Sequence, residues 1–193
     1  DLLEDVICQI ADTVRETTLL VTVAAGKSMD WYETAFGKEI KLVRCMPNTP
    51  AMVGEGCCGI CSNQRVTETE LELVLELMGS LGRTYCIRER LMDAFSAVAG
   101  SSPAYVFMFI EAMADAGVAA GMPRSQAVEV AAQAVLGSAK LLLETGRHPG
   151  ELKDMVCSPG GTTIQGVRTL EEQGMRAAVM DALLACVEQA GKL

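Results

Sequence analysis

The order of apolar patterns along the chain most constrains the fold, because that order changes near residue 88. Before this point, short apolar runs that predict strands alternate with runs of helical periodicity. Such alternation is typical of an α/β domain with a largely parallel sheet. We therefore expect residues 1–88 to form this domain, with predicted strands at residues 18–23, 41–46, 57–62 and 84–87.

After residue 88 only helical patterns remain, so residues 89–193 form a predicted all-α domain. Ser102 and Pro103 predict a helix start, because serine is a common N-cap and proline fits the first helical position. A further helix is predicted from about residue 124 to 145, ending at Gly146. It is rich in small residues and apolar on more than one face, which is typical of a helix buried on several sides. In so short a half-chain, we expect that burial to occur against a second subunit.

Composition narrows the classes of function. Half of the 193 residues are hydrophobic, so the chain can bury a sizeable core. It has no run of about 18 uncharged apolar residues, which indicates no membrane span. The net charge of −9 argues against nucleic acid or an anionic membrane as partner, but not against an anionic small molecule. The eight cysteines lie mostly in apolar runs, which predicts reduced thiols and a cytoplasmic protein.

Three features that can indicate function are interpreted here as structural. The segment 54–59 matches G-x-G-x-x-G, but a proline loop precedes it and a strand-like run follows it, so the context of a dinucleotide fingerprint is missing. Cys58 and Cys61 have C-x-x-C spacing inside a predicted strand, with no second pair to complete a zinc site. His148 is the only histidine and follows a helix end, where histidine often satisfies terminal carbonyls. We expect no metal site.

Two loops are the better candidates for binding, because each follows the carboxyl end of a predicted strand. Ligands of open α/β sheets bind at that edge. A proline-braced loop that carries Asn48 suits a flat polar group such as a carboxamide or a ribose. The alternative is a pair of ordinary turns between strands and helices. The cofactor-binding candidates are Ala24, Ala25, Gly26, Met46, Pro47 and Asn48.

A glycine-rich turn in the helical half predicts an anion site. In Ser158-Pro-Gly-Gly-Thr-Thr163, the two glycines allow positive φ and close approach of a ligand, and a helix begins at Thr162. The first N–H groups of a helix lack intrahelical partners and, with the helix dipole, favour a small anion. An ordinary capped helix after a turn and a phosphate-binding turn are the alternatives.

Several motifs taken together resemble pyrroline-5-carboxylate reductase. They follow one another in collinear order over essentially the whole chain: Val43-Arg-Cys-Met-Pro-Asn-Thr-Pro-Ala-Met-Val-Gly-Glu-Gly56, Gly100-Ser-Ser-Pro-Ala-Tyr105, Asp115 to Arg124, His148-Pro-Gly-Glu-Leu-Lys-Asp154 and Ser158-Pro-Gly-Gly-Thr-Thr-Ile-Gln-Gly166.

The resemblance implies an oxidoreductase of proline biosynthesis that reduces the C=N bond of 1-pyrroline-5-carboxylate to give L-proline. It implies NADPH or NADH as cofactor, a Rossmann-like cofactor-binding domain over residues 1–88, and a substrate-binding and dimerisation domain over residues 89–193. Family members form homodimers that can assemble further. The resemblance makes Thr163 the catalytic candidate, matching the family threonine that hydrogen-bonds the ring nitrogen. The implied substrate-binding residues are Ser158, Gly160, Gly161, Thr162 and Thr163.

The chain departs from the family pattern in two places. The family's opening strand and glycine fingerprint would precede residue 1, so we expect the chain as given to lack that part of the cofactor site. Met155 stands where some members carry an asparagine near the nicotinamide. The alternative of a different class is a non-catalytic oligomerisation module that cannot bind cofactor by itself. A different imine or hydroxyacid reductase fits the turn at residues 158–163 less well.

Overall fold

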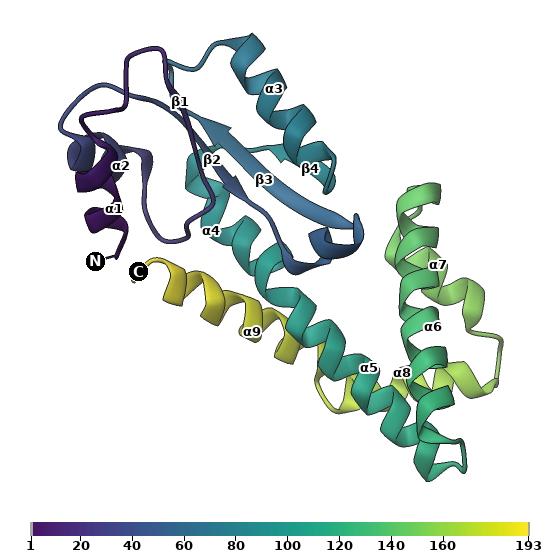
Figure 1. The fold of residues 1–193 in the computed structure, drawn as a ribbon. Coiled ribbons are helices and arrows are strands. Elements are labelled where there is room, and N and C mark those ends of the chain that lie inside the picture. The colour runs from purple at the N-terminus through teal and green to yellow at the C-terminus, as the bar shows by residue number, and fades with distance from the viewer. Residues whose placement is uncertain (1, 193) are drawn as a thin grey trace. The chain divides into compact units, whose positions relative to one another are not determined.

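A computed structural model of the chain describes residues 2–192 and divides into two units. The first unit comprises Asp1–Pro103 with Leu183–Leu193, and the second comprises Ala104–Ala182. The predicted combination of an α/β part and a helical part is confirmed (Figure 1). The predicted domain boundary at residue 88 stays a prediction.

The first unit contains a four-stranded sheet in the order β1-β2-β3-β4 (Figure 1). Its strands are β1 (Leu19–Thr22), β2 (Lys41–Met46), β3 (Gly56–Ser62) and β4 (Gly82–Cys86). Its helices are α1 (Leu2–Ile10), α2 (Met29–Phe36), the 3₁₀ helix η1 (Thr49–Val53), α3 (Glu68–Gly79), the 3₁₀ helix η2 (Glu89–Leu91), α4 (Met92–Phe95) and the π turn η3 (Ser96–Ser101).

The sheet is mixed, which differs from the expected largely parallel pairing. The pairs β1–β2 and β3–β4 are parallel, whereas β2–β3 is antiparallel. Parallel neighbours need a crossover of a dozen or more residues. The connection from β2 to β3 holds only the short helix η1 and its flanking residues, so the chain turns back on itself.

Two helices of this unit begin at side-chain caps of the kind that serine and threonine commonly provide. The hydroxyl of Ser28 accepts a hydrogen bond from the backbone N–H of Trp31 at 3.1 Å. Thr67 and Glu70 have the sequence spacing that predicts a capping box, and they form it at the start of α3. The Glu70 carboxylate also binds Lys41 Nζ at 2.6 Å, and this contact, with the bonds from Thr67, lowers the pKa of Glu70 to about 2. These contacts fix α3 against the sheet.

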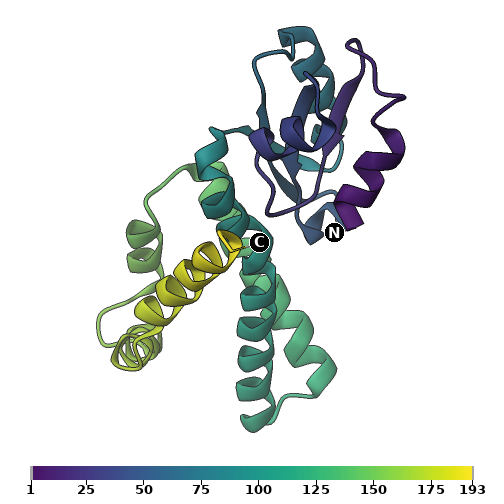
Figure 2. The ribbon, with the colours of Figure 1, turned by 90° about the vertical axis from the view of Figure 1, so that its left-hand side faces the viewer.

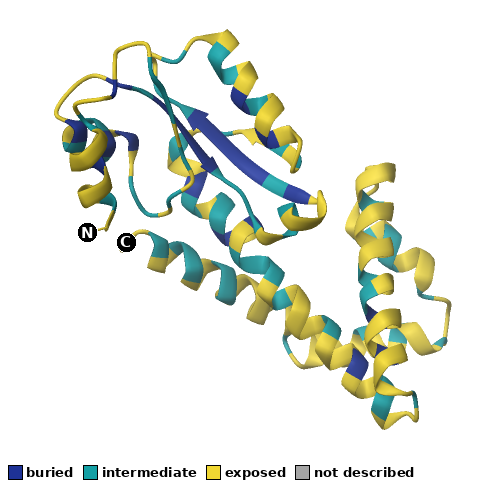
Figure 3. Cartoon of the chain, viewed as in Figure 1, coloured by how far each residue is buried: buried dark blue, intermediate teal, exposed yellow. Residues whose placement is uncertain are grey.

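The core of the first unit lies in two layers, one on each face of the sheet (Figure 3). On one face Leu42 packs with buried residues of α1 and α2, among them Ile7 and Tyr32. On the other face Val43 and other strand residues pack with α3. Successive strand residues point to opposite faces, so one β2 strand serves both layers and is nearly all buried.

The second unit is built from helices, and among its described residues there is no strand (Figure 2). Helices α5 and α9 each continue across the boundary between the units. Large apolar side chains are exposed here, for example Phe107 at 64% and Met108 at 68%. Such a surface is typical of helices that another chain covers. The helices are α5 (Ser102–Ala119), α6 (Arg124–Thr145), α7 (Pro149–Val156), α8 (Thr162–Glu172) and α9 (Met175–Ala190).

Two local predictions in the helical half are wrong. Ser102 does not cap a new helix, because helical turns run without a break from η2 into α5, and its hydroxyl donates to the Val98 carbonyl. His148 caps the start of α7, not the end of α6: its Nδ1 accepts from the Gly150 N–H at 3.1 Å. The predicted stop of α6 at Gly146 is confirmed by a left-handed φ of 62°.

One helical stretch, Glu89–Ala119, is long and apolar enough to cross a membrane when judged by length and composition alone. The core helix of a soluble protein passes the same test. This stretch includes the π turn and all of α5.

Candidate functional site

The cofactor-binding candidates lie together at one edge of the sheet in the first unit. Strands β1 and β2 are parallel, with Thr22 opposite Arg44, so their carboxyl ends meet there. Ala24 and Met46 both lie just beyond this pair. The antiparallel strand β3 begins at the same edge, because Met46 pairs with Gly59.

The loop after β1 presents small side chains and backbone to this edge. The Ala24 N–H donates to the hydroxyl oxygen of Thr22 at 3.3 Å, and that hydroxyl also lies 2.7 Å from the hydroxyl of Tyr32. Gly26 has a left-handed φ of 84°, which a side chain would disfavour. Ala25 is exposed. The contact between Thr22 and Tyr32 therefore holds the end of the strand against α2. The loop that follows carries only small side chains at residues 24–26.

The loop after β2 is rigid and is fixed by the Asn48 side chain. Its Oδ1 accepts from the Cys57 N–H at 2.8 Å, and its Nδ2 donates to the Ala99 carbonyl at 2.9 Å. Helix η1 follows with Pro50 near its start and ends at Gly54, whose φ is 77°. The sequence does not predict these side-chain contacts, since residues 48 and 99 are far apart in the chain.

The small residues and the loop backbone at this edge fit the nicotinamide half of a dinucleotide. Small residues at positions 24–26 leave room for a flat ring, and backbone groups of the two loops can meet a carboxamide or a ribose. The carboxyl ends of parallel strands are where such cofactors bind in this class of fold.

The substrate-binding candidates lie together in the second unit, at the turn into α8. Gly160 has a φ of 68°, and the Gly161 N–H donates to the Ser158 carbonyl at 3.0 Å. A Cβ built on Gly161 would overlap only the Ser158 hydroxyl oxygen, which can rotate away, so the left-handed Gly160 is the glycine that the turn requires. Gly161 is the N-cap and makes no side-chain cap.

The first N–H groups of α8 are therefore available to an anion. The N–H groups of Thr162, Thr163 and Ile164 have no intrahelical partner. Thr162 and Thr163 are exposed, as is Ser158. The helix dipole and the three nearby hydroxyls suit a small anion such as a carboxylate, which accepts hydrogen bonds.

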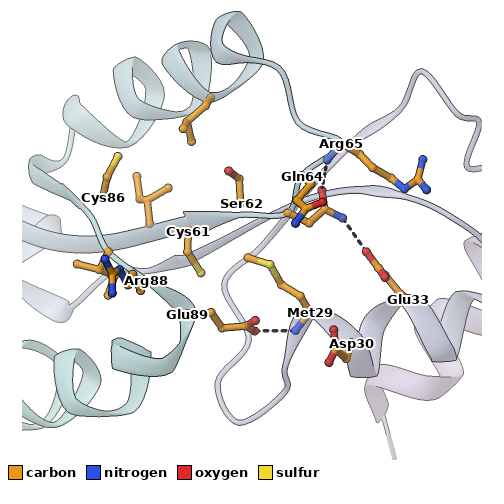
Figure 4. Close-up of a pocket in the computed structure, with 14 residues that line it drawn as sticks. Met29, Asp30, Glu33, Cys61, Ser62, Gln64, Arg65, Cys86, Arg88 and Glu89 are labelled. Carbon is orange, nitrogen blue, oxygen red and sulfur yellow. Dashed lines mark hydrogen bonds between the residues drawn. The ribbon is translucent and has the colours of Figure 1, made fainter.

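A cavity of about 920 Å³ in the first unit lies elsewhere, at the carboxyl ends of β3 and β4 (Figure 4). There Glu89 Oε1 accepts from the Met29 N–H at 2.7 Å and from Arg44 Nη1 at 2.5 Å. Arg44 is only 5% exposed. Since Arg44 pairs with Cys61, the cavity is at the far end of β3 from the candidate cofactor edge. These contacts of Glu89 hold α2 and η2 on the sheet. The sequence feature that could have indicated the ion pair is an arginine inside an apolar strand run.

Cys45 and Cys61, two buried cysteines of the sheet, are structural. Burial raises the pKa of Cys61 to about 11, and a hydrogen bond with Cys58 and burial raise the pKa of Cys45. Thiols of this kind stay protonated and unreactive at neutral pH. The interpretation of residues 54–59 as an accidental match is confirmed, because Gly59 lies inside strand β3 and not at a helix start. Within residues 2–192, no group of three or more His, Cys, Asp or Glu side chains could hold a metal ion.

Comparison with known proteins identifies similar chains over both halves. A family model described as pyrroline-5-carboxylate reductase dimerisation matches residues 89–193. The pyrroline-5-carboxylate reductase of Escherichia coli (strain K12) is 52% identical over 188 residues, which are 97% of this chain and 70% of the relative. That of Methanosarcina acetivorans is 44% identical over 191 residues, which are 99% of this chain and 71% of the relative.

Solved structures agree with the sequence comparison. A Plasmodium falciparum pyrroline carboxylate reductase with NADP bound superposes with a TM-score of 0.93 at 34% identity, covering 100% of this chain and 77% of that one. A 1-pyrroline-5-carboxylate reductase from Streptococcus pyogenes gives a TM-score of 0.86 at 38% identity, covering 96% of this chain and 73% of that one.

Proposed function

The chain belongs to the pyrroline-5-carboxylate reductase family, and from this membership we propose its activity. The chain is an NAD(P)H-dependent oxidoreductase of proline biosynthesis, and it reduces 1-pyrroline-5-carboxylate to L-proline. Relatives named for this reaction match it along nearly its whole length. This match along nearly all of the chain, and about 70% of each relative, disfavours the alternative of a non-catalytic oligomerisation module.

The helical half makes the protein a homo-oligomer, because the dimerisation family covers residues 89–193. The finer proposal is a homodimer that can assemble further. Exposed apolar residues of α5 and α6, such as Phe107 and Leu136, support it, since a second copy would remove them from water.

The substrate carboxylate is proposed to bind at the start of α8. The single observation that carries this is the turn geometry: Gly160 is left-handed, Gly161 leaves the helix uncapped, and Thr162 and Thr163 are exposed beside it. A carboxylate at a helix N-terminus gains about 0.3–1 kcal/mol from the dipole, and up to about 2 kcal/mol when partly buried. Hydrogen bonds to the charged oxygen atoms add to this gain. The proposed ligands are Ser158, Gly160, Gly161, Thr162 and Thr163.

Thr163 is proposed to act on the ring nitrogen. Its hydroxyl follows the first N–H groups of the helix, so a ring held there by its carboxylate meets the hydroxyl at its nitrogen. A hydroxyl can donate to this nitrogen or accept from it as the C=N bond becomes an amine. Fixing the ring in one orientation supplies much of the rate enhancement available to a reaction of this kind.

NADPH or NADH, when bound, supplies the hydride that adds to the C=N carbon. The loops after β1 and β2 are proposed to hold its nicotinamide half and to exclude water from it. The proposed contacts are with Ala24, Ala25, Gly26, Met46 and Pro47 and with the backbone of Asn48.

The proposed location is the cytoplasm, with neither nucleic acid nor membrane as partner. The net charge of −9 disfavours both polyanionic surfaces, and free thiols such as the buried Cys45 suit a reducing compartment.

A coupled product assay tests the proposed activity. The protein is mixed with NADPH and 1-pyrroline-5-carboxylate, and both cofactor oxidation and the enantiomers of proline are measured. We expect one L-proline for each NADPH consumed and no D-proline. A folded oligomer that consumes no cofactor, or consumes it without forming proline, would contradict the proposal; the same assay with NADH gives the cofactor preference.

A further inference from the structure

Asn48 makes two hydrogen bonds that connect three separate parts of the first unit. It lies at the carboxyl end of β2, its Oδ1 binds the N–H of Cys57 at the start of β3, and its Nδ2 binds the carbonyl of Ala99 in the π turn. All three residues are partly or fully buried. The side chain therefore links the loop after β2 to both of its neighbours.

The π turn explains why the Ala99 carbonyl needs a hydrogen-bond donor such as the Asn48 amide. Hydrogen bonds in a π turn run five residues back, so a carbonyl there can leave the regular α-helical pattern. The Val98 carbonyl accepts from the Ser102 hydroxyl, and the Ala99 carbonyl accepts from Asn48. Ala99 is 9% exposed, so losing the amide would leave its carbonyl buried with one partner fewer, which is costly.

The residue just before the π turn packs against the sheet. A Cβ built on Gly59 would lie 2.7 Å from Cδ1 of Phe95, so the ring rests directly on the backbone of β3. Ala97 is 3% exposed. The π turn thus has a fixed place on the sheet, and Asn48 transfers that fixed position to the loop that carries Met46 and Pro47.

We propose that Asn48 is a positioning residue for the cofactor: its amide sets the loop after β2 against the π turn, and the loop backbone then meets the nicotinamide half. This inference rests on the proposed function. It assigns the Asn48 side chain to holding the loop in place, and not to direct contact with the cofactor. Shifts of about 1 Å in such a loop are enough to weaken binding and catalysis.

Two variants separate the contacts. Asn48→Ala removes both hydrogen bonds. Asn48→Asp keeps an oxygen acceptor for the Cys57 N–H but loses the donor to Ala99 and places a carboxylate against a carbonyl. The matched control is Asn63→Ala, because Asn63 also ties backbone together: its Nδ2 donates to the Ile40 carbonyl at 2.8 Å, and its Oδ1 accepts from the Leu42 N–H at 3.3 Å, at the opposite end of β3.

The first readout is amide hydrogen exchange in the cofactor-free protein. We expect the Cys57 amide to lose protection in Asn48→Ala and to keep it in Asn48→Asp. The second readout is the Kd for NADPH, measured by fluorescence titration. We expect it to rise roughly tenfold in both variants, equivalent to about 1.4 kcal/mol, and to stay at the wild-type value in Asn63→Ala even if that variant melts earlier.

Three outcomes decide the matter. Tight NADPH binding by Asn48→Ala and Asn48→Asp overturns the inference, as does an equal loss of affinity in Asn63→Ala, which would make the effect one of stability alone. A wild-type protein that neither binds NADPH nor forms L-proline contradicts the proposed function, and the inference fails with it. That failure is distinguishable because it appears before any variant is made.

Discussion

Replacing Thr163 with valine is expected to lower kcat/KM for 1-pyrroline-5-carboxylate by about 10²–10³-fold, or about 2.7–4 kcal/mol, the usual cost of losing one hydrogen bond made to the reacting group. Valine keeps the branched shape of threonine and removes only the hydroxyl. The helix should therefore form as before while the ring nitrogen loses its partner. Steady-state kinetics at saturating NADPH measure the effect.

Two further variants control for changes in the helix itself. Thr169→Val alters a threonine of the same helix whose hydroxyl donates to the Gln165 carbonyl at 3.1 Å, and it should leave kcat/KM close to wild type. Thr163→Ser keeps a hydroxyl and should recover much of the lost rate. Wild-type kinetics in Thr163→Val, or an equal loss in Thr169→Val, would remove Thr163 from the reaction.

Gly82→Ala is expected to cost about 3–5 kcal/mol of folding free energy, because backbone strain and overlap add together. Gly82 has a φ of 143° and pairs with Gly56 at the start of β3 and β4. A Cβ at this position would overlap the backbone nitrogen and oxygen of Gly56, and a backbone cannot move aside as a flexible side chain can. Most domains have only about 5–15 kcal/mol of stability in total, so urea unfolding should show a large drop in midpoint.

Gly37→Ala is the matched variant for Gly82→Ala. Gly37 also has a positive φ, 62°, but a Cβ there meets nothing within 4 Å. The folding free energy of Gly37→Ala should fall only by the conformational cost of a left-handed residue with a side chain, about 1–2 kcal/mol. Equal unfolding midpoints for the two variants would show that the approach of Gly82 to Gly56 is not tight.

The sequence predicts those parts of the fold that depend on local chemistry. The strand Lys41–Met46 is confirmed at its exact ends, and the capping box at Thr67 and the stop at Gly146 are confirmed as well. Each of these features is decided by neighbouring residues, through burial on both faces, reciprocal capping or a left-handed glycine.

Features that depend on distant contacts were not predictable in this way. The π turn at Ser96–Ser101 replaces the break expected at Ser102, because Phe95 rests on Gly59 and Asn48 binds Ala99. The antiparallel direction of β3 follows from the short connection after β2. The length of this connection can be read from the sequence, but the direction in which it turns cannot.

The candidate site follows the same division. The turn at residues 158–161 has the left-handed Gly160 that the sequence suggests, since this geometry is local. The choice of a substrate carboxylate over phosphate came from the family resemblance, because a helix N-terminus accepts either anion. The role of Asn48 needed the structure, since its partners lie 9 and 51 positions away.

The most direct test of the account is a thermal-shift titration of the protein with L-proline, D-proline and inorganic phosphate. The carboxylate of the product is proposed to bind the turn at residues 158–163, so L-proline alone should raise the melting temperature. A ligand at about 100 times its Kd adds about 2.7 kcal/mol of stability, which is readily seen. The shift should become smaller in Thr163→Val, which removes one of the proposed hydrogen bonds. Stabilisation by phosphate without any by L-proline would contradict the account.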